Sequence, residues 1–457
     1  MRKLAAWTTY LIVAGLTLSS AAAAERAPAG GESRRKGPLA ALPSKPGPHI
    51  EKIAALGDDS WLDLGAPAPD PVWGVGIGRA WSSKMAYAPD LRGAFLYGPG
   101  VHGGCTVRNG KKHYNDDLFF YDVNAHRWVC VYPGLEIGKY NAKANDDGFE
   151  VDEQGHPRPV ACMVHAYQGV TYDTDRKMFA HLFNPSGGGY WEPLMPERVA
   201  FIKENSERLN GLGGTQLRCG MFPSRLNQAS PWFYDTAEGH WRRQKTQTPT
   251  PAIGHGAHLI YLPPQKKFFF LGQGGTHLYD PEKNEWTKLS PAGQGPRKPI
   301  DAASCYDPKR ERIYIAMGSY GVPEDIPGVE NQVVAYDIAK NAWIDLQAKG
   351  QLPPRPEAVV GVNVSIMHYD SANDVVLYFA LGRDMNKSFE TCGIYAYDAA
   401  RSEWKLVTRA LPETETWKSG CNHCFYDPEL NAHFIYKAGD SRAEGGMFVY
   451  RYKRAAK

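Results

Sequence analysis

The stretch YDVNAHRW at residues 121–128 decides the fold, because its pattern returns four more times along the chain. Every copy has Tyr-Asp, then five residues, then Trp. The copies begin at Tyr121, Tyr234, Tyr279, Tyr336 and Tyr397. An apolar run ends at each Tyr, another begins at each Trp, and turn-forming residues separate the two runs. Each copy therefore predicts a β-hairpin.

A second predicted hairpin comes before each copy of the pattern. Its first form reads MAYAPDLRGAFLYG, and the six forms begin at Met85, Gly169, Leu259, Ser304, Met367 and His423. Two hairpins per unit make a four-stranded antiparallel blade. Units that recur every 40 to 60 residues or so are typical of β-propellers.

The last unit lacks its fourth strand at the C-terminus, where only GMFVYRYK (446–453) follows the hairpin. The segment Trp61-Leu62-Asp63-Leu64 closely copies Trp343-Ile344-Asp345-Leu346. An N-terminal strand that completes the last blade would close the ring and leave no sheet edge exposed. We therefore predict an all-β fold, a single closed β-propeller of six four-stranded blades. The long gap between Trp128 and Trp241 leaves room for a seventh.

These blades resemble kelch repeats over residues 57–457. The Tyr-Asp and Trp positions carry the resemblance, whereas the Gly-Gly pair of kelch blades is poorly kept, with Gly274-Gly275 as one remnant. The resemblance implies a propeller fold, and kelch-like propellers often have no catalytic role.

The N-terminus has the pattern of a secretory signal peptide. Arg2 and Lys3 precede an apolar run at 4–18, and small residues follow up to residue 24. The run is shorter than the roughly 18 apolar residues that a membrane anchor needs. We predict a signal peptide at 1–24, a Pro- and Gly-rich linker at 25–56, and a protein that is secreted or periplasmic.

The charge balance excludes some partners. The formal net charge is +3, and it falls to +1 without residues 1–24, which hold two basic residues and no acidic one. We expect no nucleic-acid partner, no membrane insertion and a monomer.

The loops that link strands two and three, and one blade to the next, are long and share one face of the predicted ring. The longest, at 184–230, contains a predicted helix. Long loops on a rigid scaffold commonly carry binding residues. We expect this long-loop face to bind an extracellular ligand, a glycan or a protein.

An enzymatic alternative is a polysaccharide lyase. The chain is similar to propeller-fold lyases that cleave uronate-containing glycans such as ulvan, in its signal peptide, length, single-domain build and histidine-rich face. The resemblance implies that Tyr and His handle the proton beside the carboxylate, while Arg or His neutralises the acid. The candidate catalytic residues are His102, His165, Tyr190 and Arg225.

The chain has eight cysteines, and Cys421, His423 and Cys424 lie close together at the start of the last blade. A C-x-x-C spacing suits tetrahedral zinc when other ligands come from elsewhere, and His258 is a candidate for one. The alternatives are a disulfide or structural thiols. On a strand, His423 and Cys424 point to opposite sides, so one ion could bind both only if the strand bends.

Overall fold

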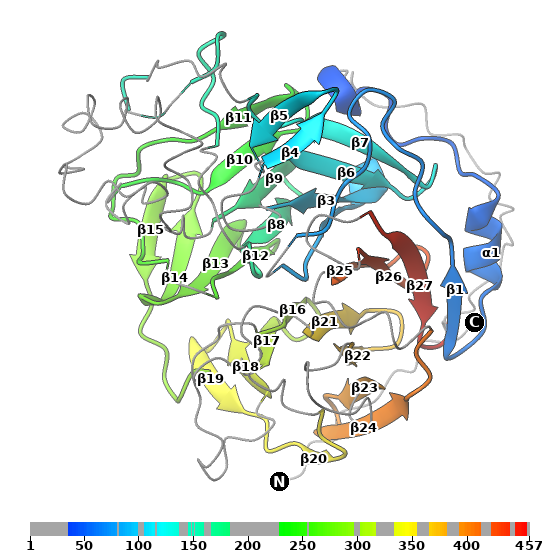
Figure 1. Ribbon diagram of the computed structural model, residues 1–457. Helices are drawn as coiled ribbons and strands as arrows, with labels where there is room; N and C mark the ends of the chain where they lie inside the picture. Colours follow the sequence, from blue (N-terminus) through cyan, green and yellow to red (C-terminus); the bar gives the residue numbers. More distant parts are fainter. Residues whose placement is uncertain are drawn as a thin grey trace, which may run out of the picture. The chain divides into compact units, whose positions relative to one another are not determined.

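The computed structural model describes residues 35–79, 82–98, 105–114, 117–136, 145–147, 149, 151–159, 166–182, 228–253, 256–296, 302–316, 333–353, 365–381, 393–412, 422–438 and 444–454. They form six blades of four antiparallel strands, arranged as a β-propeller (Figure 1). The predicted fold is therefore confirmed with six blades in the described residues. Strands β8, β12, β16, β21 and β25 lie towards the centre of the ring in Figure 1.

The blades follow one another in chain order. Blade 1 contains β2 (Ala86–Ala88), β3 (Gly93–Tyr97), β6 (Leu118–Asp122) and β7 (Arg127–Tyr132). Blade 2 contains β8 (Val170–Asp173), β9 (Met178–His181), β10 (Trp232–Asp235) and β11 (His240–Arg242). Blade 3 contains β12 (His258–Leu262), β13 (Lys267–Gly272), β14 (Gly275–Asp280) and β15 (Glu285–Lys288).

The second half of the ring is built in the same way. Blade 4 contains β16 (Ser304–Asp307), β17 (Arg312–Ala316), β18 (Val333–Asp337) and β19 (Ala342–Asp345). Blade 5 contains β21 (Ser365–Asp370), β22 (Val375–Ala380), β23 (Gly393–Asp398) and β24 (Glu403–Thr408), with the short parallel strand β20 (Lys349–Gly350) at its edge. Blade 6 contains β25 (Asn422–Asp427), β26 (Ala432–Lys437), β27 (Gly446–Arg451) and β1 (Ser60–Asp63).

Five short elements complete the described structure. Strands β4 (Cys105–Arg108) and β5 (Lys111–Tyr114) form a hairpin between β3 and β6. The helices are α1 (His49–Ala55) and the 3-10 turns η1 (Gly37–Leu39) and η2 (Pro89–Leu91).

The repeated Tyr and Trp face each other across the outer hairpin of the first five blades. In blade 3, Tyr279 and Trp286 are directly paired residues of β14 and β15, and their ring centroids lie 4.9 Å apart. The other four copies pair in the same register, with centroid separations between 5.1 and 5.6 Å. Such pairs stabilise a sheet beyond the area they bury. This explains why the sequence repeats these two residues at fixed spacing.

The residues between Tyr and Trp form the turn. In blade 3, Asp280 Oδ1 accepts hydrogen bonds from the backbone N–H groups of Glu282 and Lys283. The fifth residue after each Tyr has a positive φ, between 48° and 77°, which Gly and Asn tolerate best. The residues at this position are His126, Gly239, Asn284, Asn341 and Ser402.

The side chain of Asn284 makes two hydrogen bonds that connect this turn to neighbouring residues, and replacing Asn284 tests how much these bonds stabilise the protein. Its Oδ1 accepts from the Tyr279 hydroxyl at 2.8 Å, and its Nδ2 donates to the Lys245 carbonyl at 2.7 Å. We expect Asn284→Ala to lower the free energy of unfolding by about 1–2 kcal/mol, because both bonds are lost and the backbone keeps φ 54°. Chemical denaturation measures this, with Lys283→Ala in the same turn as a control that changes stability by less than about 0.5 kcal/mol. Equal effects from the two variants would contradict the role given to Asn284.

The N-terminal strand closes the ring as predicted. Strand β1 pairs antiparallel with β27, and Trp61 lies opposite Tyr450 with their ring centroids 4.9 Å apart. Tyr450 is fully buried, and its hydroxyl donates to Asp59 Oδ1 at 2.8 Å. The Tyr–Trp pair found inside the other blades is therefore rebuilt here from the two ends of the chain.

Residues 35–56, within the segment predicted as a linker, contact the propeller. Arg35 forms an ion pair with Asp90 at 2.8 Å, and Ile53 of α1 is completely buried. The described residues from Arg35 onward belong to one compact unit.

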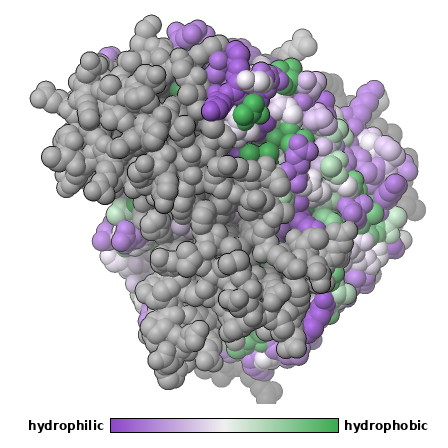
Figure 2. All heavy atoms as spheres, in the orientation of Figure 1, coloured by the Kyte–Doolittle hydropathy of each residue, from purple (hydrophilic) through white to green (hydrophobic). Residues whose placement is uncertain are grey.

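The described surface mixes polar and apolar side chains, as Figure 2 shows for one face. Large exposed apolar residues in the described segments are Val72, Val107 and Leu352. None of the described helices has the length and apolar character needed to cross a membrane.

Candidate functional site: the central channel

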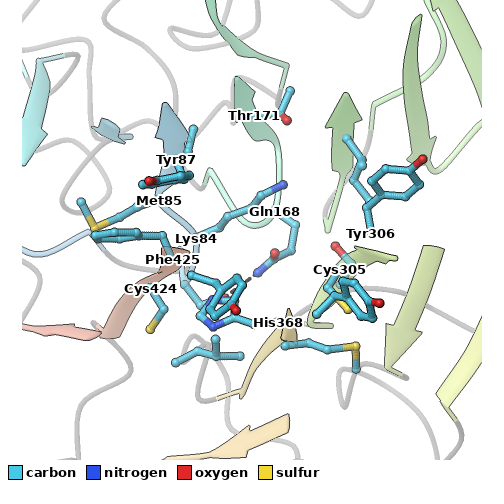
Figure 3. Close-up of a pocket in the computed structure, with 18 of the residues that line it drawn as sticks. Lys84, Met85, Tyr87, Gln168, Thr171, Cys305, Tyr306, His368, Cys424 and Phe425 are labelled. Atoms are coloured by element: carbon cyan, nitrogen blue, oxygen red, sulfur yellow. Dashed lines mark hydrogen bonds between the residues drawn. The ribbon is translucent and has the colours of Figure 1, made fainter. Parts of the chain in front are cut away.

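A cavity of about 330 Å³ lies among the first strands of the six blades. Its lining comes from β2, β8, β12, β16, β21 and β25 and from the residues just before β2 and β8. Figure 3 shows side chains from several blades converging on this space. The volume is at the lower end of the range for small-molecule sites.

Each blade contributes one tyrosine to the cavity wall, next to the short turn after its first strand. These residues are Tyr87, Tyr172, Tyr261, Tyr306, Tyr369 and Tyr426. Several hydroxyls bond to a carboxylate of the preceding blade: Tyr172 donates to Asp90 at 2.9 Å, and Tyr426 donates to Asp370 at 3.1 Å. Burial raises the pKa of both tyrosines, so their hydroxyls stay protonated. Several of these six tyrosines therefore stabilise the contacts between neighbouring blades.

Lys84 is the cation of the cavity. Its side chain extends from blade 1 across the channel (Figure 3). There, Nζ donates to the Leu259 carbonyl of blade 3 at 3.1 Å. Burial lowers the pKa of Lys84 to about 8, and among the described residues only the Cys305 thiol opposes this shift. No described carboxylate compensates its charge. An ammonium group in this position favours an anionic partner.

The shifted pKa predicts how Lys84 affects stability. Below pH 8 the folded protein holds a poorly solvated ammonium. Between pH 8 and about 10.5 the unfolded chain binds more protons at this position than the folded one does, so stability rises with pH across this window. We expect Lys84→Met to raise the free energy of unfolding at pH 7 by about 1–2 kcal/mol, after allowance for the partial exposure of the side chain.

Denaturation of both proteins from pH 7 to 10.5 checks this expectation, because other titrating groups cancel in the difference. The difference in the free energy of unfolding between Lys84→Met and the wild type should become smaller as the pH rises from 8 to 10.5. If this difference stays constant over that range, the pKa of Lys84 is not lowered.

His368 is a second titratable group on the cavity wall. Its Nδ1 lies 3.1 Å from Nδ1 of His433, whose Nε2 lies 3.4 Å from Asp370 Oδ2. Burial, His433 and Lys84 together lower the pKa of His368 well below its usual value. His368 is therefore neutral at neutral pH.

Polar groups without charge complete the wall. The Gln168 amide donates to the Ser83 hydroxyl, and Thr171 Oγ1 accepts from the Tyr261 backbone N–H at 3.2 Å. Met85, Ile260, Ile366 and Phe425 supply apolar surface. The site thus combines one cation, one neutral histidine, amide and hydroxyl groups, and an apolar wall.

The predicted catalytic residues His102, His165, Tyr190 and Arg225 lie outside the described residues. Their roles stay predictions, as does the role of the loop at 184–230, whose described part is residues 228–230.

The candidate zinc ligands are partly described. Cys421 lies outside the described residues. His423 Nε2 accepts from the Arg79 backbone N–H at 2.9 Å, and burial, with Arg79 nearby, lowers the His423 pKa to about 3. Cys424 is buried in an apolar cluster, and His258 Nδ1 lies 2.9 Å from Ser304 Oγ. In the described segments, no three His, Cys, Asp or Glu side chains are grouped as a metal site would need.

Sequence reasoning missed Lys84 and His368, although the repeat contains a signal for Lys84. Lys84 stands three residues before Tyr87, where the last blade has His423 before Tyr426 and the third has His258 before Tyr261. Aligning the blades on the inner tyrosine places Lys84 at the same repeat position as these histidines, near the start of the first strand.

Comparisons with known proteins add little. No family model matches the sequence, and no curated protein does. Among solved structures, a similar chain is an auxiliary nutrient binding protein from Bacteroides thetaiotaomicron, with 8% identity and a TM-score of 0.43. The alignment covers 86% of this chain and 77% of that one. Similarity at this level carries no argument about this protein, and what the channel binds has to be inferred from its own residues.

Proposed function

We propose that this protein is a secreted ligand-binding propeller and that its ligand is an acidic glycan. The observation that carries the proposal is Lys84, whose ammonium group lies in the cavity with one hydrogen bond and no carboxylate partner among the described residues. A carboxylate on a sugar would neutralise this charge. The ammonium–carboxylate contact is stronger here than in bulk water because the cavity is partly desolvated.

The remaining wall fits a sugar. Hydroxyl and amide groups on Ser83, Gln168 and Thr171 line the cavity and can bond to sugar hydroxyls, while the half-buried rings of Tyr87, Tyr306 and Tyr426 offer apolar surface to the sugar. One charged sugar would occupy the channel. The long-loop face, where we predicted the ligand, would hold the sugars on either side of it.

Calorimetric titration tests the proposal. The ligands are short oligomers of galacturonate, glucuronate, guluronate and mannuronate, each compared with its methyl ester, which keeps the sugar and removes the charge. We expect at least one acid to bind and its ester to bind at least ten times more weakly. If no acid binds, or if acid and ester bind equally, the proposal is wrong.

A second candidate, a polysaccharide lyase acting by β-elimination, is favoured by one observation. The neutral His368, hydrogen bonded to His433, lines the same cavity as Lys84. Lys84 would offset the carboxylate charge, which makes the proton on the adjacent carbon more acidic, and a neutral histidine can take that proton.

Elimination creates an unsaturated uronate that absorbs ultraviolet light. The lyase candidate predicts this absorbance with at least one acidic polysaccharide, its loss in His368→Ala, and retained binding of the same substrate by that variant. Binding without any rise in absorbance would leave the binding proposal standing and exclude the lyase.

A structural zinc at Cys421, His423, Cys424 and His258 stays a prediction from the sequence, with a disulfide or structural thiols as the alternatives, and in the structure both histidines already have hydrogen-bond partners. Elemental analysis with a free-thiol count tests it. One zinc per chain, with thiols that become reactive after chelation, is the expected result, and absence of metal from the purified protein would contradict it.

A further inference from the structure

Lys84 has the features of an amine nucleophile as well as those of a counter-charge. Its Nζ projects into a cavity instead of pairing with a carboxylate, and its one described hydrogen bond is to a carbonyl oxygen. Lysines in such desolvated positions act as nucleophiles towards carbonyl compounds.

The protonation state supports this reactivity. Nζ lies in the cavity and donates one hydrogen bond to a neutral carbonyl oxygen, and such a desolvated setting disfavours the charged form of the amine. The titratable groups that face it are Cys305 on β16 and His368 on β21. Burial raises the pKa of Cys305 and lowers that of His368, so both are neutral at pH 7.

We infer that Lys84 forms a covalent imine with ligands that carry a free aldehyde, which makes acidic sugars with a free reducing end the preferred ligand class of the channel. The inference rests on the proposed binding of acidic glycans at the same site.

The reaction is a condensation and needs no oxidant or reductant. The neutral Nζ attacks the carbonyl carbon of the open-chain sugar, the N–C bond forms, and the electron pair of the C=O double bond moves to oxygen, which takes a proton. The nitrogen gives up a proton, the new hydroxyl group takes a second proton from solvent, and the nitrogen lone pair forms the C=N bond as the C–O bond breaks and water leaves. His368, on the same cavity wall, can carry the proton from nitrogen to oxygen. The imine is protonated at nitrogen, so the positive charge that holds the carboxylate is kept.

Reductive trapping tests the inference. The full-length purified protein is incubated at pH 7 with D-galacturonic or D-glucuronic acid and sodium cyanoborohydride, which reduces imines to stable amines. Intact mass and peptide mapping then locate the adduct. We expect one adduct per chain, on Lys84, at sugar concentrations that leave the exposed Lys112 and Lys283 unmodified. Lys84→Arg should lack this adduct, with its fold checked by an unchanged melting transition.

The methyl glycosides of the same acids separate this inference from the function on which it rests. They have the carboxylate but no aldehyde, so they should bind, compete with trapping and never be incorporated. Binding of the glycosides without any adduct on Lys84 would overturn the imine alone. If the glycosides do not bind and labelling is spread over exposed lysines, both proposals are wrong.

Discussion

Replacing Lys84 by Met weakens the binding of an acidic oligosaccharide by at least about 30-fold, because truncating one partner of a desolvated charge pair costs about 2 kcal/mol or more. Met keeps the length and apolar stem of the side chain and removes only the charge. In the wild type, affinity should also fall as the pH rises through about 8, where Lys84 loses its proton. Calorimetric titration of both proteins at pH 6.5, 7.5 and 9 measures the two effects.

Two controls make the result specific. Lys84→Arg keeps a cation in the channel, so it should retain more affinity than Lys84→Met and lose the decline above pH 8. Lys283→Met removes an exposed lysine from a turn of blade 3 and should bind like the wild type. Equal affinity of the wild type and Lys84→Met would exclude Lys84 as the ligand's counter-charge.

Removing the N-terminal strand should have the largest effect on folding. A chain that begins at Gly65 lacks β1, so β27 loses its partner and Tyr450 loses the ring of Trp61. Loss of the half-buried Trp61 ring alone costs about 2 kcal/mol, and the rest of the strand adds to this. Total stabilities are commonly about 5–15 kcal/mol. We expect this chain to aggregate or to unfold without a cooperative transition.

A chain that begins at Arg35 is the matched control and should melt like the full-length protein. Adding a peptide of residues 35–64 to the shorter chain should restore a cooperative transition, because the edge of β27 is open to it. In the intact chain, Trp61→Ala should cost about 2 kcal/mol, less than a fully buried Trp would, since Trp61 is only half-buried. A cooperative transition in the Gly65 chain without peptide would contradict ring closure by β1.

The fold could be predicted because each step of it is local in the sequence. Residues 279–286 contain both the turn, with Asp280 and Asn284, and the cross-strand pair of Tyr279 and Trp286, and the same pattern occurs in five of the six blades. Ring closure was also predictable, because the sequence at 61–64 closely copies the sequence at 343–346, most of which lies in the fourth strand of another blade.

The candidate site was harder to predict because it is made by residues far apart in the chain. Lys84 of blade 1 reaches Leu259 of blade 3, and His368 of blade 5 meets His433 of blade 6. Which side chain crosses the channel depends on the orientation of whole blades, and no local pattern encodes that. The sequence predicted His258 and His423 as zinc ligands. In the structure, both histidines make buried hydrogen bonds at the start of β12 and β25.

The state of Lys84 can be measured directly by NMR of protein labelled with ¹³C at lysine Cε, with the Lys84 resonance assigned by its absence in Lys84→Arg. Uncompensated burial in the channel predicts a pKa of about 8 for the free protein and a higher value once an acidic oligosaccharide is bound. An ordinary lysine pKa near 10.4 that the ligand leaves unchanged would contradict the central role given to Lys84.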